Sequence, residues 1–88
     1  MKALAAADSA NIRMDLPHFQ ERMIERDIDM RSVLEVLRKG RPFGLPELDE
    51  YNDWRIRMRR KVAGRRVAVV VAVHDDHIDC ITTWTSGS

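Results

Sequence analysis

The chain has 88 residues, of which 44% are hydrophobic and 33% are charged, and its formal net charge at pH 7 is +1. This length and balance predict one globular domain and exclude an intrinsically disordered chain. The single cysteine, Cys80, excludes an internal disulfide and a cysteine-built zinc site, and the longest apolar run, Val67 to Val73, is too short to cross a bilayer. We therefore expect a cytoplasmic protein that makes no membrane contact.

The first helix is predicted to begin at the segment Asp15-Leu16-Pro17, because proline is favoured in a first helical turn. Residues 1–14 before it have no apolar stripe, so we expect a flexible leader. Leu16, Phe19 and Met23 follow the spacing i, i+3, i+7 and predict a buried helix face. The helix should end near Asp27.

A second helix is predicted from Asp29, a residue type that caps helix N-termini well. Ile28 and Val33 flank it as a hydrophobic staple would. Lys39 and Gly40 are typical of a helix end, with glycine at the position after the last turn.

The period of the hydrophobic pattern changes to two at Trp54, which predicts a strand after the loop of residues 41–50. Ala63-Gly64 turns the chain into Val67 to Val73, which is apolar on both faces and should be the central strand. A last strand is expected over His77 to Trp84, and residues 86–88 are expected to be a flexible tail. These elements predict a single α+β domain over residues 15–85, with two N-terminal helices packed on a three-stranded antiparallel sheet.

Charge is distributed unevenly around the first strand. Residues 55–66 contain seven Lys or Arg and no acid, whereas residues 47–53 contain four acids and no base. Arg55, Arg57 and Arg59 alternate with apolar residues, so they share one sheet face at about 6.6 Å spacing, close to the repeat of a nucleic-acid backbone. This predicts a nucleic-acid-binding stripe; the alternative is an ordinary solvated strand face. Thr83 on the last strand is expected to share this face.

The first helix places His18, Arg22 and Arg26 at i, i+4, i+8, which puts all three on one face. A histidine beside two guanidinium groups suits phosphodiester cleavage, because the imidazole can move a proton and the arginines can stabilise the developing charge. The alternative is ion pairing with Glu21, Glu25 and Asp29, which lie at helical spacing. His74 and His77 flank an Asp-Asp turn, but no further ligand cluster is evident in the sequence, so we expect no metal site and no cofactor.

The segment from His18 to Gly40 resembles a widespread bacterial family of small uncharacterised domains. The shared pattern is a histidine, then Arg22-Met23, then Arg26 and Ile28, with a short second helix. A hairpin turned at Gly64 and a strand ending in Ile81-Thr82 follow. In layout the family is similar to the RelE, ParE and BrnT toxins, within the barnase–EndoU–colicin–RelE grouping.

This resemblance implies a RelE-like fold and a toxin of a toxin–antitoxin pair that acts as a metal-independent endoribonuclease, cleaving RNA by 2′-hydroxyl attack. It implies catalytic roles for His18, Arg22, Arg26 and Thr83, RNA as substrate, and an acidic antitoxin as partner. The alternative is a non-catalytic module that binds nucleic acid or protein, as ParE-like inhibitors do, or a structural subunit that dimerises through a sheet edge. Fold analogy alone does not separate these functions.

Overall fold

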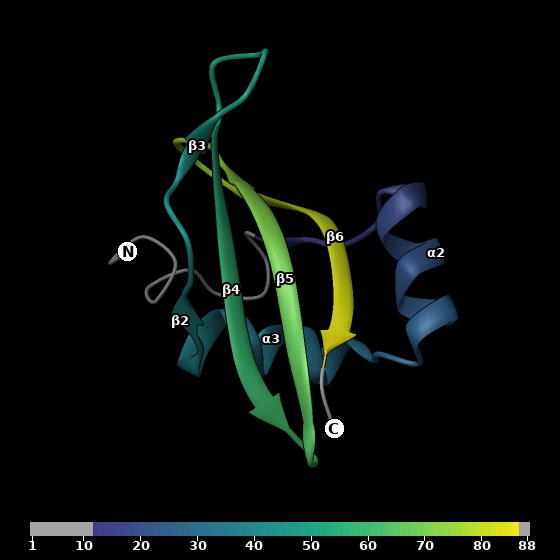
Figure 1. Cartoon of the computed structure of the whole chain (residues 1–88). Helices are drawn as coiled ribbons and strands as arrows, with labels where there is room; N and C mark the ends of the chain where they lie inside the picture. The colour runs from purple at the N-terminus through teal and green to yellow at the C-terminus, as the bar shows by residue number, and fades with distance from the viewer. Residues whose placement is uncertain (1–11, 87–88) are drawn as a thin grey trace.

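A computed structural model describes residues 12–86; the first eleven residues and the last two lie outside the described part (Figure 1). Two helices, α2 (Pro17–Arg26) and α3 (Met30–Lys39), precede the three long strands β4 (Trp54–Val62), β5 (Arg65–Val73) and β6 (Ile78–Ser86). Three two-residue strands complete the described elements: β1 (Ile12–Arg13), β2 (Arg41–Pro42) and β3 (Glu47–Leu48). The predicted α+β class and both helices are confirmed.

The described sheet has six strands, in the order β1-β6-β5-β4-β2, with β3 also paired to β4. The long strands form an antiparallel meander with β5 at its centre, as the apolar run of that strand predicts. The prediction of three strands is wrong in number. The additional strands are two residues long, so they have no hydrophobic period, and only pairing with a long strand defines them.

The N-terminal strand β1 pairs in parallel with β6, with Ile12 opposite Ile78. Ile12 and Met14 are buried in the core. The predicted flexible leader is therefore wrong for residues 12–14, and its remaining residues lie outside the described part of the chain. The segment from Ile12 to Met14 is too short to show a stripe of its own, which is why the sequence pattern did not reveal it.

Both helices pack on one face of the sheet, with α3 against β4 and β5 and α2 against β6 (Figure 1). Phe19 of α2 and Val33, Val36 and Leu37 of α3 supply the buried helix faces. Alternate residues of the strands, including Met58, meet them from the sheet. The opposite sheet face has no helix over it in the described chain, and we call it the open face.

The turn between the helices follows the predicted chemistry. The Asp29 side chain accepts a hydrogen bond from the backbone N–H of Ser32 at 2.8 Å, so its predicted role as N-cap is confirmed. This bond lowers the pKa of the Asp29 carboxyl. Asp27 ends α2 with φ at 54°, a left-handed conformation that aspartate tolerates better than most residues.

Gly40 ends α3 as expected, but not because it adopts the left-handed backbone that usually favours glycine at a helix end. Its φ is −76°, so no left-handed backbone demands a glycine. A Cβ at this position would lie 2.3 Å from the carbonyl oxygen of Val36 and 2.8 Å from that of Arg59. The absence of a side chain lets the end of α3 approach strand β4, which brings the basic residues of both elements together.

Among the described residues, no helix is long and apolar enough to span a membrane.

Candidate nucleic-acid interface

Two pairs of like charges lie directly opposite each other on the open face. Arg41 of β2 pairs with Arg59 of β4, and Lys61 of β4 pairs with Arg66 of β5. Directly opposed side chains of like charge destabilise a sheet, each pair by a few tenths of a kcal/mol or more. Among the described residues no carboxylate forms an ion pair with any of these four cations, so the repulsion is not relieved within this part of the chain.

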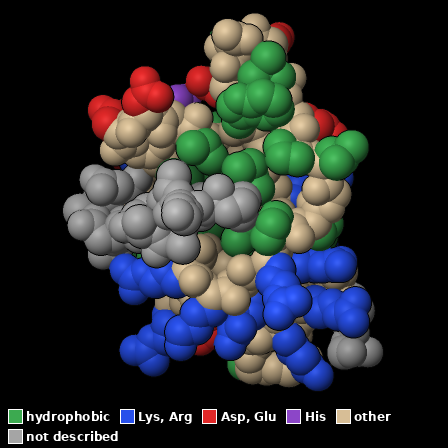
Figure 2. All heavy atoms as spheres, turned by 90° about the vertical axis from the view of Figure 1, so that its left-hand side faces the viewer, with side chains coloured by type: hydrophobic (Ala, Val, Ile, Leu, Met, Phe, Trp, Pro, Cys, Tyr) green, Lys and Arg blue, Asp and Glu red, His purple; other side chains and the backbone are tan. Residues whose placement is uncertain are grey.

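These four cations line a groove of about 410 Å³ at the end of the sheet where β4 turns into β5. We call it the basic groove; its described lining residues are Lys39, Gly40, Arg41, Pro42, Arg59, Arg60, Lys61 and Arg66. Figure 2 shows Lys and Arg side chains gathered at the lower end of the molecule, with acidic side chains at its upper end. No acid is among the lining residues, so the groove concentrates positive charge in a domain of almost neutral total charge.

One groove arginine is held in place by the helix. Arg60 points to the helix side of the sheet, where its Nε lies 3.3 Å from an oxygen of Glu35 on α3. Its guanidinium also donates to the carbonyl oxygen of Lys39 at 3.3 Å. These contacts fix the C-terminal end of α3, and therefore Lys39, beside β4. Arg60 thus shapes the groove, whereas the opposed pairs on the open face supply its unbalanced charge.

An aromatic contact adjoins the basic groove on the open face. The Phe43 ring lies edge-on to Trp84 of β6, with the ring centroids 6.3 Å apart, and the Arg59 guanidinium lies 4.9 Å from the Phe43 centroid. Arg59, Ala68 and Trp84 form one row across three strands. Because Phe43 contacts both ends of that row, its ring lies across the small Ala68. Cations beside aromatic faces are the combination that binds single-stranded nucleic acid.

The predicted stripe of Arg55, Arg57 and Arg59 does share one sheet face, since β4 alternates as expected. Two of its members, however, form ion pairs with the preceding loop. Arg55 Nε lies 3.2 Å from Asp49, and Arg57 donates to Glu47 at 2.5 Å. The nucleic-acid-binding role of the stripe stays a prediction, and Arg59 is the member that adjoins the basic groove.

Asp49 does more than neutralise Arg55. One of its carboxylate oxygens accepts hydrogen bonds from the backbone N–H groups of Tyr51 and Asp53, both at 2.9 Å. The N–H of Asp53 is the main cause of the lowered pKa of the Asp49 carboxyl, and that of Tyr51 and the Arg55 guanidinium add to it. Asp49 therefore stays ionised at neutral pH. Its contacts fix the loop that precedes β4 to the start of that strand.

The predicted triplet of the first helix lies elsewhere in the fold. His18 and Arg26 are exposed, and Arg22 forms an ion pair with Glu25 of the same helix at 2.5 Å. The helix α2 packs against β6 on the helix side of the sheet, whereas Arg57 and the basic groove lie on β4 and the open face (Figure 1). The structure does not bring the triplet and the stripe of Arg55, Arg57 and Arg59 into one site, although Arg65 of β5 donates to the backbone carbonyl oxygens of Arg26 and Asp27 at 3.2 and 2.7 Å.

Thr83 does not share the face of Arg57, and the expectation that it does is wrong. Thr83 pairs with Val69 on the helix side, because a register shift between Val70 and Val71 inserts an additional residue into β6. Its side chain is 1% exposed, and its hydroxyl donates to the carbonyl oxygen of Ala68 at 2.7 Å. A buried hydroxyl with a satisfied hydrogen bond has a structural explanation that requires no substrate.

The sequence analysis did not predict that Arg41, Lys61 and Arg66 lie together in one groove. Arg41 lies in the segment that was predicted to be a loop, and only its pairing with β4 places it opposite Arg59. Lys61 and Arg66 flank the Ala63-Gly64 turn, and a tight hairpin makes such residues direct neighbours. The equal distance of Lys61 and Arg66 from the turn was therefore the signal in the sequence that could have revealed this pair.

The family comparison adds a classification. A family model described as a domain of unknown function (DUF4258) matches residues 16–85, which span both helices and the three long strands. No curated protein and no solved structure matches the chain. The match covers most of the 88 residues, so the chain belongs to the DUF4258 family.

Proposed function

We propose that this domain binds single-stranded RNA through the basic groove, with phosphates between the opposed cations. The observation that supports this most directly is the pair of like-charge contacts, Arg41 with Arg59 and Lys61 with Arg66. Each phosphate placed between two such side chains would replace repulsion by two charge-assisted contacts. The groove is therefore stabilised by an anionic ligand.

The aromatic residues favour RNA over an acidic peptide as the ligand of this groove. Phe43 and Trp84 contact each other on the open face beside the groove, and both are half-buried, so neither is enclosed in the core. Stacking of a base on an aromatic side chain contributes about 1–3 kcal/mol and tolerates any sequence. An acidic peptide would use the cations but would gain nothing specific from the rings.

Similarity in layout to the RelE, ParE and BrnT toxins gives this proposal a second support, by analogy of fold. Within that analogy an acidic antitoxin segment would bind the same groove and exclude RNA from it. Such competition follows from the chemistry of the groove, because carboxylates and phosphates would meet the same guanidinium and ammonium groups.

Endoribonuclease activity is a second proposal, with His18 as general acid or base. Its support is the exposure of His18 and Arg26 on one face of α2 without an ion pair to any described residue. This site would use Arg22 and Arg26 for the phosphate. It would act apart from the basic groove, so cleavage and groove binding are separable by mutation.

The experiment measures binding of a labelled single-stranded RNA of about ten nucleotides by fluorescence anisotropy, within the length range that one small fold covers. The variant Lys61→Glu/Arg66→Glu should lose most of the affinity. The matched control Arg31→Glu/Arg38→Glu changes the same number of charges at two exposed positions of α3 outside the groove lining, and should bind nearly as the wild type does.

Equal losses in the two double variants would show that net charge, rather than the groove, determines affinity. No binding by the wild type would overturn the proposal. Incubating the same RNA with wild type and His18→Ala tests the second proposal, since a lost general acid or base should slow cleavage by roughly a hundredfold or more.

A further inference from the structure

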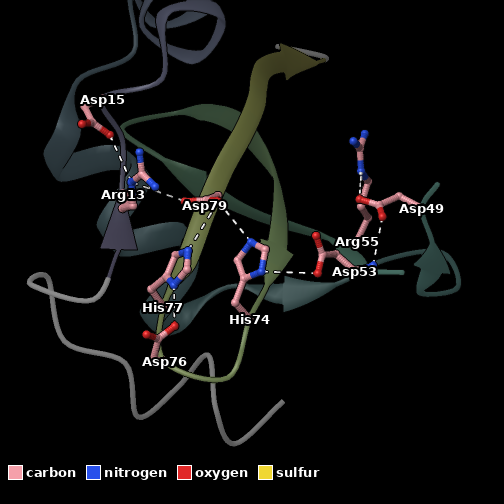
Figure 3. Close-up of polar contacts among 9 residues, drawn as sticks. All are labelled: Arg13, Asp15, Asp49, Asp53, Arg55, His74, Asp76, His77 and Asp79. Atoms are coloured by element: carbon pink, nitrogen blue, oxygen red, sulfur yellow. Dashed lines mark hydrogen bonds and ion pairs between the residues drawn. The ribbon is translucent and has the colours of Figure 1, made fainter. Parts of the chain in front are cut away.

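The turn between β5 and β6 brings two histidines and an aspartate together at the end of the sheet opposite to the basic groove. His74 and His77 flank the turn, and Asp79 is the second residue of β6. One ring nitrogen of each histidine and one carboxylate oxygen of Asp79 all lie within 4.8 Å of one another. Figure 3 shows both rings directed toward the same carboxylate.

The distances in this His-His-Asp cluster match those between ligands of one metal ion. The Nε2 atom of His74 lies 3.1 Å from Asp79 Oδ2, and the Nε2 atom of His77 lies 3.6 Å from the same oxygen. In a tetrahedral zinc site with bonds of 2.0–2.2 Å, neighbouring ligand atoms are about 3.3–3.6 Å apart. The two imidazoles are stacked with centroids 4.3 Å apart and planes 18° from parallel, so the rings must tilt toward each other for both Nε2 lone pairs to meet at one ion.

Besides Asp79, each histidine contacts a further carboxylate through its other ring nitrogen, Nδ1, and this contact orients the ring. Asp53 lies 3.3 Å from Nδ1 of His74, and Asp76 lies 2.6 Å from Nδ1 of His77. The hydrogen bond between Nδ1 of His77 and Asp76 leaves Nε2 of His77 on the side of Asp79. This carboxylate–histidine arrangement is the one that supports metal-binding imidazoles in proteins.

The charges around the cluster also favour a bound cation. Asp53, Asp76 and Asp79 contact the two imidazoles, and Arg13 is the nearest described cation, with its Nε 3.6 Å from Asp79 Oδ1. Arg13 also pairs with Asp15, so it only partly compensates these acids. Asp79 Oδ1 is buried and accepts no hydrogen bond from the described residues. A divalent cation would offset the excess of negative charge without protonating the rings.

We propose that His74, His77 and Asp79 bind one divalent transition-metal ion, of which Zn²⁺ is the representative. Two imidazole nitrogens and one carboxylate favour zinc and its neighbours over Mg²⁺ or Ca²⁺, which prefer oxygen ligands. Three protein ligands leave a further coordination position for water or another ligand. The ion would tie the β5–β6 turn to strand β6. Because Asp79 also contacts Arg13 of β1, the proposed site adjoins that strand as well.

The experiment is isothermal titration of the untagged, chelator-treated full chain with ZnCl₂ near pH 7.5, together with thermal melting at increasing zinc. The wild type should bind one equivalent, and its melting temperature should rise with zinc concentration, because only the folded cluster places the three ligands together. His77→Gln should weaken zinc binding at least tenfold, and Asp76→Asn, which removes only the orienting carboxylate, should weaken it by roughly ten- to a hundredfold.

Two control variants test whether the cluster is responsible. Asp75→Asn removes an exposed acid of the same turn, and His18→Gln removes the histidine of α2; neither should change zinc affinity. Mg²⁺ should give no comparable heat. Binding that survives His77→Gln, that is lost equally in His18→Gln, or that is absent from a folded wild type would overturn the proposal. If His77→Gln does not fold, the Asp76→Asn titration decides the outcome.

Discussion

Neutralising one opposed pair in the basic groove should change RNA affinity and protein stability in opposite directions. The informative variant is Lys61→Gln/Arg66→Gln, which removes two charges but retains unbranched, polar side chains. Both residues are exposed, and their strands are paired by backbone hydrogen bonds that the substitutions leave in place. Any change in binding therefore reports the charges rather than the fold.

The expected size of the binding effect follows from the number of phosphates that the groove can neutralise. With one phosphate between Arg41 and Arg59 and one between Lys61 and Arg66, two phosphates are neutralised, so the logarithmic salt slope for a single strand is about 1.4, or roughly a sevenfold loss of affinity between 50 and 200 mM salt. With one phosphate left, the slope falls to about 0.7, or roughly a threefold loss over the same range. The two proteins should therefore differ most at low salt and converge as salt rises.

Stability should change in the other direction. Because Lys61 and Arg66 oppose each other directly, removing both charges relieves a repulsion of a few tenths of a kcal/mol. The variant should melt at the same temperature as the wild type or slightly above it in low salt. This outcome separates a loss of ligand contacts from a loss of structure, which would lower affinity and melting temperature together.

The assay is anisotropy of a labelled RNA at four or five salt concentrations, with thermal melting in the same buffers. Arg31→Gln/Arg38→Gln on α3, at two exposed positions outside the groove lining, serves as the matched control and should retain a slope close to that of the wild type. An unchanged slope in the Lys61→Gln/Arg66→Gln variant would refute the assignment of phosphates to this pair. A slope that fell equally in the control would show that the whole surface, and not the groove, attracts the RNA.

Two further predictions concern the elements that position these sites. Gly40→Ala should destabilise the fold by about 2 kcal/mol or more, seen as a drop of roughly 10 °C in melting temperature, since the added Cβ would overlap the Val36 carbonyl. The lowered pKa of Asp29 means that its contribution to stability is fully present above its ordinary pKa of 3.8 and is lost as pH falls through the lower folded value. Melting curves between pH 6 and 3 should therefore be less steeply pH-dependent for Asp29→Asn than for the wild type.

The sequence alone was sufficient to predict the elements that have long hydrophobic patterns. Helix α3 has a capping aspartate and a stripe of four apolar positions, and β5 has an uninterrupted valine-rich run, so both were predicted close to their observed bounds. Strand β2 consists of Arg41 and Pro42 and has no period at all. Its position depends on Gly40, which allows the chain to leave α3 directly alongside β4, and that is a tertiary contact rather than a local preference.

The sites were harder to predict because they depend on pairing between strands. Alternation along β4 placed Arg55, Arg57 and Arg59 on one face correctly, but it could not show that loop acids pair with the first two. Thr83 was assigned to the wrong face because one additional residue in β6 reverses the alternation beyond the bulge. The sequence shows His74, His77 and nearby acids, but only the fold places Asp53 and Asp79 on opposite sides of the His74 imidazole.

The two proposed sites lie at opposite ends of the same three strands, which makes them independent in experiments. Arg66 and His74 are eight residues apart along β5 and its extension, about 26 Å at the rise of an extended strand. That separation is about three Debye lengths at physiological salt, where charges interact weakly through solvent. His77→Gln should therefore leave RNA affinity unchanged, and Lys61→Glu/Arg66→Glu should leave zinc affinity unchanged. If zinc instead altered RNA affinity in the wild type but not in His77→Gln, RNA would extend across the open face from the basic groove to the metal.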